Sequence, residues 1–150
     1  MHVQKLLFLS AYFTGIVFLS SGGDCHAAST TEDYELQNRC GKSAATFFEK
    51  RFGTGNKYDD FGQTISTYTN HYNKKLNKCF ILVDEFIFPN DKKKFHMSKG
   101  QTLFDVIENK YYGFFGTGCS DDSMSPCEML NKDCNSEAEW DALVKPYMEE

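Results

Sequence analysis

Apolar side chains dominate both sides of one stretch of the chain, Lys78 to Phe88, which reads KCFILVDEFIF. In an extended strand, one side holds Cys79, Ile81 and Val83, and the other side holds Phe80, Leu82, Phe86 and Phe88. A strand that is apolar on both sides needs cover on both sides, and β-branched and aromatic residues favour the extended conformation. The pattern predicts a central strand, with a bend or an emergence into solvent at Asp84 and Glu85.

Two other segments, one before this strand and one near the C-terminus, have apolar residues at the spacing of a helix. From Thr31 to Phe52, apolar residues recur every three or four positions, which is typical of an amphipathic helix. At the other end, Ser136 followed by Glu139 forms a capping box ahead of a short apolar stripe that includes Trp140. We expect this last helix to kink or end near Lys145, because Pro146 lacks a backbone N–H.

Between the helices, three further stretches alternate like strands, at residues 64–72, 102–107 and 111–115. Residues 127–130 also fit a short edge strand. Because sequential strands with short connections pair as neighbours, we expect an antiparallel meander. The predicted fold class is α+β, with the N-terminal helix packed on a four-stranded antiparallel meander and a short helix at the C-terminus.

The first 27 residues have the layout of a secretory signal peptide: Lys5, an apolar run and then small residues. Residues 28–150 then form a single α+β domain without a stable membrane span, in the periplasm or outside the cell. Cleavage after Ala27 or after Gly23 are both compatible with the pattern, and the choice decides whether Cys25 survives. An uncleaved anchor is the alternative, although the apolar run is short for a span of about 20 residues.

Six cysteines behind an export signal favour disulfide bonds over thiol chemistry. Spacing predicts that Cys40 bonds to Cys79, clipping the first helix to the central strand, and that Cys127 bonds to Cys134. Cys119 is left for Cys25, for a partner chain, or as a free thiol. The cysteines and histidines lack metal-ligand spacing, so we predict no metal site and no cofactor.

The formal charge of −5 argues against nucleic-acid binding, which requires many clustered cations. The lysine run at residues 92–94 is too short for that purpose, and its alternatives are a solvated loop tip or a surface that steers an acidic protein partner. No motif assigns a catalytic residue. Aromatic side chains next to a histidine suggest a binding surface instead, made of Tyr68, His71, Tyr72, Tyr111 and Tyr112. Ordinary half-buried sheet positions are the alternative for these residues.

Three segments, HYNKKLNKCFILV (71–83), TLFDVIENKYYGFF (102–115) and SEAEWDALVKPYMEE (136–150), resemble an uncharacterised family of small exported proteins of Gram-negative bacteria. The resemblance spans most of the domain and implies a periplasmic or secreted location, but it implies no activity, ligand or catalytic residue.

Taken together, these patterns favour a non-enzymatic binding or inhibitory protein that recognises a protein partner or an envelope ligand. Two alternatives stay open. One is a small envelope hydrolase that uses acidic residues or Cys119. The other is a self-associating structural protein, in which the side of the central strand carrying Phe80 is buried in a homodimer.

Overall fold

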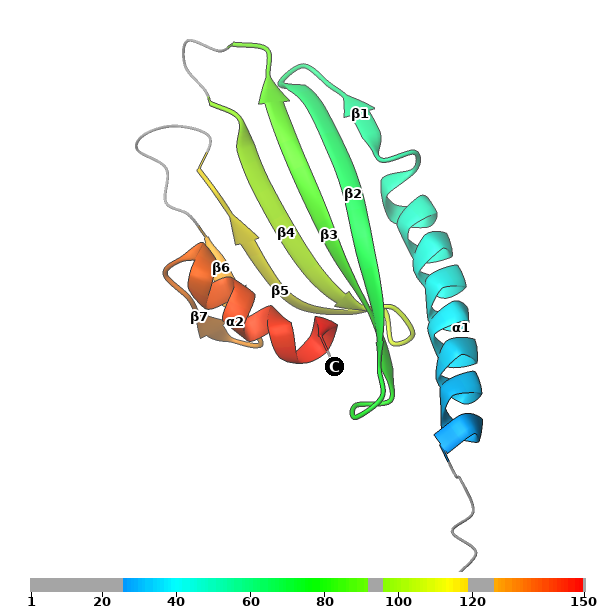
Figure 1. Ribbon diagram of the computed structural model, residues 1–150. Helices are drawn as coiled ribbons and strands as arrows, with labels where there is room; N and C mark the ends of the chain where they lie inside the picture. Colours follow the sequence, from blue (N-terminus) through cyan, green and yellow to red (C-terminus); the bar gives the residue numbers. More distant parts are fainter. Residues whose placement is uncertain (1–25, 92–95, 119–125, 150) are drawn as a thin grey trace, which may run out of the picture.

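The computed structural model describes residues 26–91, 96–118 and 126–149 (Figure 1). In chain order, the elements of these residues are α1 (His26–Phe52), β1 (Asn56–Tyr58), β2 (Gly62–Asn73), β3 (Lys78–Pro89), β4 (Ser98–Asp105), β5 (Lys110–Gly116), β6 (Cys127–Met129), β7 (Lys132–Asp133) and α2 (Glu137–Met148). The strands form one antiparallel sheet of seven, in chain order from β1 to β7. The α+β class is confirmed, whereas the prediction of four strands was wrong.

The additional strands are β1, β6 and β7, which have only two or three residues each. Those of β1 and β7 are exposed, whereas Cys127 and Met129 of β6 are buried. All three residues of β1 are exposed, and β1 is held by pairing with Gln63–Ile65 of β2. A short strand was expected at residues 127–130, but β6 is not the edge, because β7 pairs with it. The turn between them places Leu130 and Asn131 at φ 48° and 64°, the double positive φ of a type I′ hairpin.

The central strand, β3, runs from Lys78 to Pro89 without a break at Asp84 and Glu85. The Oδ1 of Asp84 accepts a hydrogen bond from the Nε2 of Gln101 at 2.6 Å, and Glu85 accepts one from the hydroxyl of Ser66. Because side chains on the neighbouring strands satisfy both carboxylates, the strand continues through them. Of the two alternatives predicted for this position, emergence into solvent fits, since both side chains are half-buried and the strand is not interrupted. The predicted pairing of neighbouring strands is confirmed for β2 and β3.

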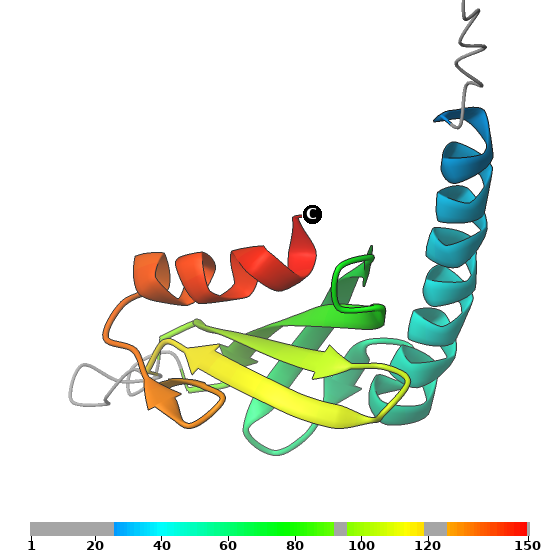
Figure 2. The same cartoon turned by 90° about the horizontal axis from the view of Figure 1, so that it is seen from below.

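The two helices cover opposite faces of the sheet. The α1 face contains the buried cluster Cys40, Ala44, Phe48, Cys79, Ile81, Val83, Phe104 and Val106. The α2 face contains Phe80, Leu103, Tyr112, Phe115, Cys127, Met129, Cys134, Trp140 and Val144. Figure 2 shows α2 lying along its face, while the first turns of α1 extend beyond the sheet. The division of the central strand into two apolar faces is as predicted.

Both predicted disulfide bonds are present. Cys40 of α1 bonds to Cys79 of β3, with a Cα–Cα distance of 5.3 Å. Cys127 and Cys134 bond across the β6–β7 hairpin, with a Cα–Cα distance of 5.0 Å. Cys25 and Cys119 lie outside the described residues. Two disulfide bonds in a chain of this size are typical of an oxidising compartment.

Side-chain hydrogen bonds hold the two helices in different ways. At the start of α2, the hydroxyl of Ser136 accepts the N–H of Glu139 at 3.2 Å, and the Glu139 carboxylate accepts the N–H of Asn135 at 2.7 Å. The predicted cap by Ser136 is therefore confirmed, whereas Glu139 bonds the residue before the cap and not the N–H of Ser136 itself. α1 begins at His26, earlier than predicted, and its Gln37 side chain accepts the N–H of Tyr72 at the edge of β2, at 2.8 Å.

At the C-terminal part of α2, one of the two predicted alternatives, an end near Lys145, is wrong. The helix continues through Pro146 to Met148 instead of ending near Lys145. Pro146 lies in the last turn, and its carbonyl accepts a hydrogen bond at 2.8 Å from the side chain of the buried Asn73. This contact ties the helix end to the last residue of β2. Among the described residues, neither helix is long and apolar enough to cross a membrane.

Candidate ligand-binding groove

The five residues predicted to form a binding surface lie on both faces of the sheet. Tyr68 and Tyr72 are on the α1 face, where the ring of Tyr68 packs 4.6 Å from that of Phe48. Tyr111 is also on the α1 face, with its ring 6.1 Å from that of Phe104 and 46% of the residue exposed. Partial burial raises the pKa of the Tyr111 hydroxyl.

His71 and Tyr112 lie on the opposite, α2 face. His71 pairs with Phe80 across β2 and β3, and its Nε2 has no hydrogen-bond partner among the described residues. Tyr112 is buried with its ring 5.2 Å from that of Phe80 and 5.4 Å from that of Tyr147, and burial raises the pKa of its hydroxyl. The sheet therefore separates His71 and Tyr112 from the three tyrosines of the α1 face.

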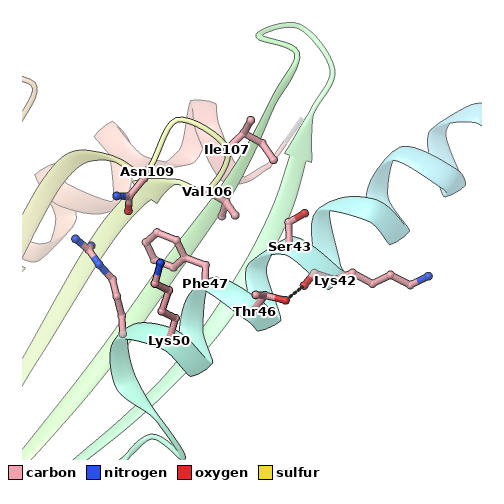
Figure 3. Close-up of a pocket in the computed structure, with 9 residues that line it drawn as sticks. Lys42, Ser43, Thr46, Phe47, Lys50, Val106, Ile107 and Asn109 are labelled. Atoms are coloured by element: carbon pink, nitrogen blue, oxygen red, sulfur yellow. Dashed lines mark hydrogen bonds between the residues drawn. The ribbon is translucent and has the colours of Figure 1, made fainter.

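The side chains that do gather are those of a groove between α1 and the β4–β5 turn (Figure 3). This groove has a volume of about 660 Å³ and is called the α1 groove below. It is lined by Lys42, Ser43, Thr46, Phe47, Lys50 and Arg51 from α1, and by Val106, Ile107 and Asn109 from the turn. Figure 3 shows Lys50 beside Phe47, whereas Lys42 extends away from the ring.

A buried carboxylate shapes the turn that forms one wall of the groove. Asp105 is fully buried, and its Oδ1 accepts the N–H groups of Ile107 and Glu108 at 3.0 and 3.1 Å. The ammonium group of Lys78 lies 2.5 Å from the other Asp105 oxygen and 2.7 Å from the Glu108 carboxylate. The hydrogen bond to Asp105, followed by the one to Glu108, raises the pKa of Lys78 well above its usual value.

This bonding keeps the apolar side chain of Ile107 in solvent. The residue is 70% exposed although it follows the buried Val106, whose N–H donates to the carbonyl of Cys79 at 2.8 Å. A turn held at both ends by hydrogen bonds cannot fold its exposed side chain into the core. Ile107 therefore remains available as an apolar surface at the rim of the groove.

Arg51 is held over the floor of the groove by two aromatic rings. Its guanidinium carbon lies 5.2 Å from the centre of the Phe47 ring and 4.7 Å from that of Phe104, and the two rings are 5.3 Å apart. These distances are within the range of cation–π attraction. An arginine held in this way can donate two parallel N–H groups to a carboxylate or another oxyanion.

The groove is cationic in an acidic protein. No carboxylate lines it, and within the described ranges none of Lys42, Lys50 and Arg51 forms an ion pair. The whole chain nevertheless has a formal charge of −5. Unpaired cations around an apolar floor create a local positive potential that attracts anions.

A second hollow, of about 360 Å³, continues from the first along α1. The two share Ser43 and Ile107, and the second is lined also by Leu36, Arg39, Cys40, Tyr72, Asn77 and Cys79. The Cys40–Cys79 disulfide thus forms part of its wall, and Tyr72 is the predicted binding residue that lies there. The hydroxyl of Tyr72 donates to the side chain of Asn77 at 2.6 Å.

Sequence reasoning missed Lys50, Arg51 and Ile107. The available signals were weak. Lys50 and Arg51 lie beside the apolar stripe of the predicted helix, and Ile107 is the last residue of a predicted strand, where an apolar residue is not needed. The lysines considered as a partner-steering surface, residues 92–94, lie outside the described residues, as does Cys119. Among the described residues, no group of three histidine, cysteine or acidic side chains is placed to hold a metal ion.

Comparison with known proteins gives no relative. No family model, no curated protein and no solved structure matches this chain.

Proposed function

We propose that this protein is an exported, non-enzymatic binding protein of the periplasm or extracellular space, and that the α1 groove holds an anionic ligand with an apolar part. The observation that carries the proposal is the combination of Lys50 and Arg51, without carboxylate partners among the described residues, and the exposed Ile107. The cations favour a negatively charged ligand, and the apolar floor favours a hydrophobic group on the same ligand.

Two features of the scaffold support a binding role. The disulfide bond between Cys40 and Cys79 and the hydrogen bonds around Asp105 hold the two walls of the groove in place before any ligand arrives. A site that is already formed loses less conformational entropy on binding. The disulfide bonds also fit the location outside the cytoplasm that the signal-like leader predicts.

A pair of fluorescent probes tests this function. Anilinonaphthalene sulfonate is an anion with an apolar ring system, and phenylnaphthylamine is its neutral counterpart. We expect the anionic probe to bind about tenfold more tightly than the neutral one, because a charge-assisted contact with Arg51 or Lys50 adds roughly 1.4 kcal/mol. Added salt should weaken the binding of the anionic probe but not that of the neutral probe, since the groove is open to solvent.

The double variant Lys50→Gln, Arg51→Gln should remove this preference while leaving the melting temperature nearly unchanged. Lys145→Gln is the matched control, because Lys145 is an exposed lysine on α2 whose partner is Glu149. Equal binding of both probes by the wild-type protein, or an anion preference that survives the double variant, would refute the proposed function.

A further inference from the structure

We propose that the natural occupant of the α1 groove is an acidic peptide segment of a protein partner, bound along α1 with one large apolar side chain against Ile107. This inference rests on the proposed function and specifies its ligand.

The α1 groove and the second hollow together form one elongated groove. The two hollows share Ser43 and Ile107 and together run along α1 from Leu36 to Arg51. At about 1.5 Å per helical residue, this distance is roughly 22 Å. An extended peptide rises about 3.3 Å per residue, so the groove has room for about seven peptide residues. A small molecule would fill only one of the two hollows.

The cations are distributed along the groove rather than gathered at one point. Arg39 lines the second hollow, whereas Lys50 and Arg51 line the first. Arg39 and Lys50 are separated by about 16 Å along the helix axis, so one carboxylate or phosphate cannot contact both. A chain with several carboxylates can, and the fixed guanidinium of Arg51 is suited to holding one of them with two parallel hydrogen bonds.

An apolar surface lies between the two cationic ends. Ile107 belongs to both hollows and is 70% exposed, and the half-buried Phe47 lies below it in the first hollow. A central apolar contact surrounded by charged positions is the usual arrangement of a protein–peptide interface. An anionic polysaccharide has charges at intervals but no large apolar group, so it leaves Ile107 without a partner.

Labelled synthetic peptides of about nine residues test the occupant, with fluorescence anisotropy as the readout. The first peptide alternates aspartate and glutamate with serine around a central leucine. The second replaces the acids by their amides, and the third replaces leucine by serine. We expect each replacement to weaken binding by about tenfold, the first through lost charge and the second through lost apolar contact.

Variants of the protein test the same two contacts. Ile107→Ser should weaken the leucine peptide about tenfold without affecting the serine peptide, because only the former uses the apolar contact. Arg39→Gln should weaken the acidic peptide but leave the small anionic probe unchanged, because the probe occupies the first hollow alone. Folding is expected to survive both changes, since both side chains are exposed or at the surface.

The outcomes separate the two proposals. If the anionic probe binds in the groove but no acidic peptide binds at about 1 mM, the peptide proposal fails and the proposed function stands. If neither binds, the proposed function fails as well. Tight binding of heparin that is unaffected by Ile107→Ser overturns the peptide in favour of a polysaccharide.

Discussion

The two faces of the sheet are each covered by one helix, yet only one face is closed. On the α2 face, Trp140 and Phe80 are fully buried, and the ring of Phe80 packs edge-on against those of Tyr112 and Tyr147. On the α1 face, Ile107 is exposed and the groove next to it is lined with cations. Exposure of a rigidly held isoleucine does not stabilise the fold, so the open face is where binding is expected.

The difference follows from where each helix meets the sheet. α2 contacts β2, β3 and β6, and its Trp140 and Val144 share a buried cluster with Leu103 of the middle strand, β4, and with Met129 of β6. α1 packs towards the β2 side, where its Phe48 contacts Tyr68, and leaves Tyr111 of β5 half exposed. α1 therefore covers β2 and β3, whereas the β4–β5 turn beside it keeps Ile107 exposed.

The largest expected effect comes from truncating the closed face. Trp140→Ala should lower the free energy of unfolding by about 4 kcal/mol, because it leaves a cavity among fully packed side chains. Ile107→Ala on the open face is the matched change and should alter it by less than about 0.5 kcal/mol. Urea unfolding followed by circular dichroism measures both. Similar losses at the two positions would show that the two faces do not differ in the way described.

The two disulfide bonds should differ in the same direction as their loop lengths. Replacing Cys40 and Cys79 by alanine opens a loop of 39 residues, whereas replacing Cys127 and Cys134 opens one of 7. In the chain-entropy model these losses correspond to about 4 and about 2 kcal/mol. Thermal unfolding of both double variants tests the ranking.

The first double variant has a second consequence, since Cys40 and Cys79 line the second hollow. The acidic peptide should then bind more weakly to this variant, whereas the Cys127 and Cys134 variant should bind it normally. A larger stability loss from the shorter loop, or equal peptide binding by both variants, would contradict this account.

Much of the fold was predictable because its signals are local and periodic. The two apolar faces of β3, the N-cap at Ser136 and the Cys40–Cys79 bond each follow from the spacing of a few residues. β1 and β7 were missed because their residues are exposed and carry no apolar pattern. Their pairing depends on the length of β2 and on a tight turn, which only the assembled sheet reveals.

The groove was not predictable in the same way. Ile107 and Lys50 are far apart in the sequence, and their proximity depends on the angle at which α1 crosses the sheet. One error was avoidable: adjacent residues of a strand point to opposite faces, so the prediction that Tyr111 and Tyr112 share a surface conflicts with strand geometry. The structure indeed divides them, and β5 carries a register shift opposite Leu103 and Phe104.

Lys78 bonds both the buried Asp105 and the Glu108 of the open turn, and its removal should cost about 2 kcal/mol at neutral pH, the size of a hydrogen bond between charged groups. Because the folded-state pKa of Lys78 is raised, its contribution is complete below the unfolded pKa of about 10.4 and is lost as pH rises towards the folded pKa. The stability difference between wild type and Lys78→Met should therefore shrink above about pH 10.4. Urea unfolding at a series of pH values measures it, and a constant difference would exclude the linkage.

The smallest expected effect concerns the start of α2. Ser136→Ala should lower the free energy of unfolding by about 1 kcal/mol, because the N–H of Glu139 loses its acceptor. Ser136→Asp is the control: aspartate caps equally well, and its charge favours the helix N-terminus, so stability should be kept. Since α2 covers the closed face alone, both variants should bind the acidic peptide like wild type. Weaker peptide binding by the stable Ser136→Asp variant would mean that α2, not α1, carries the binding surface.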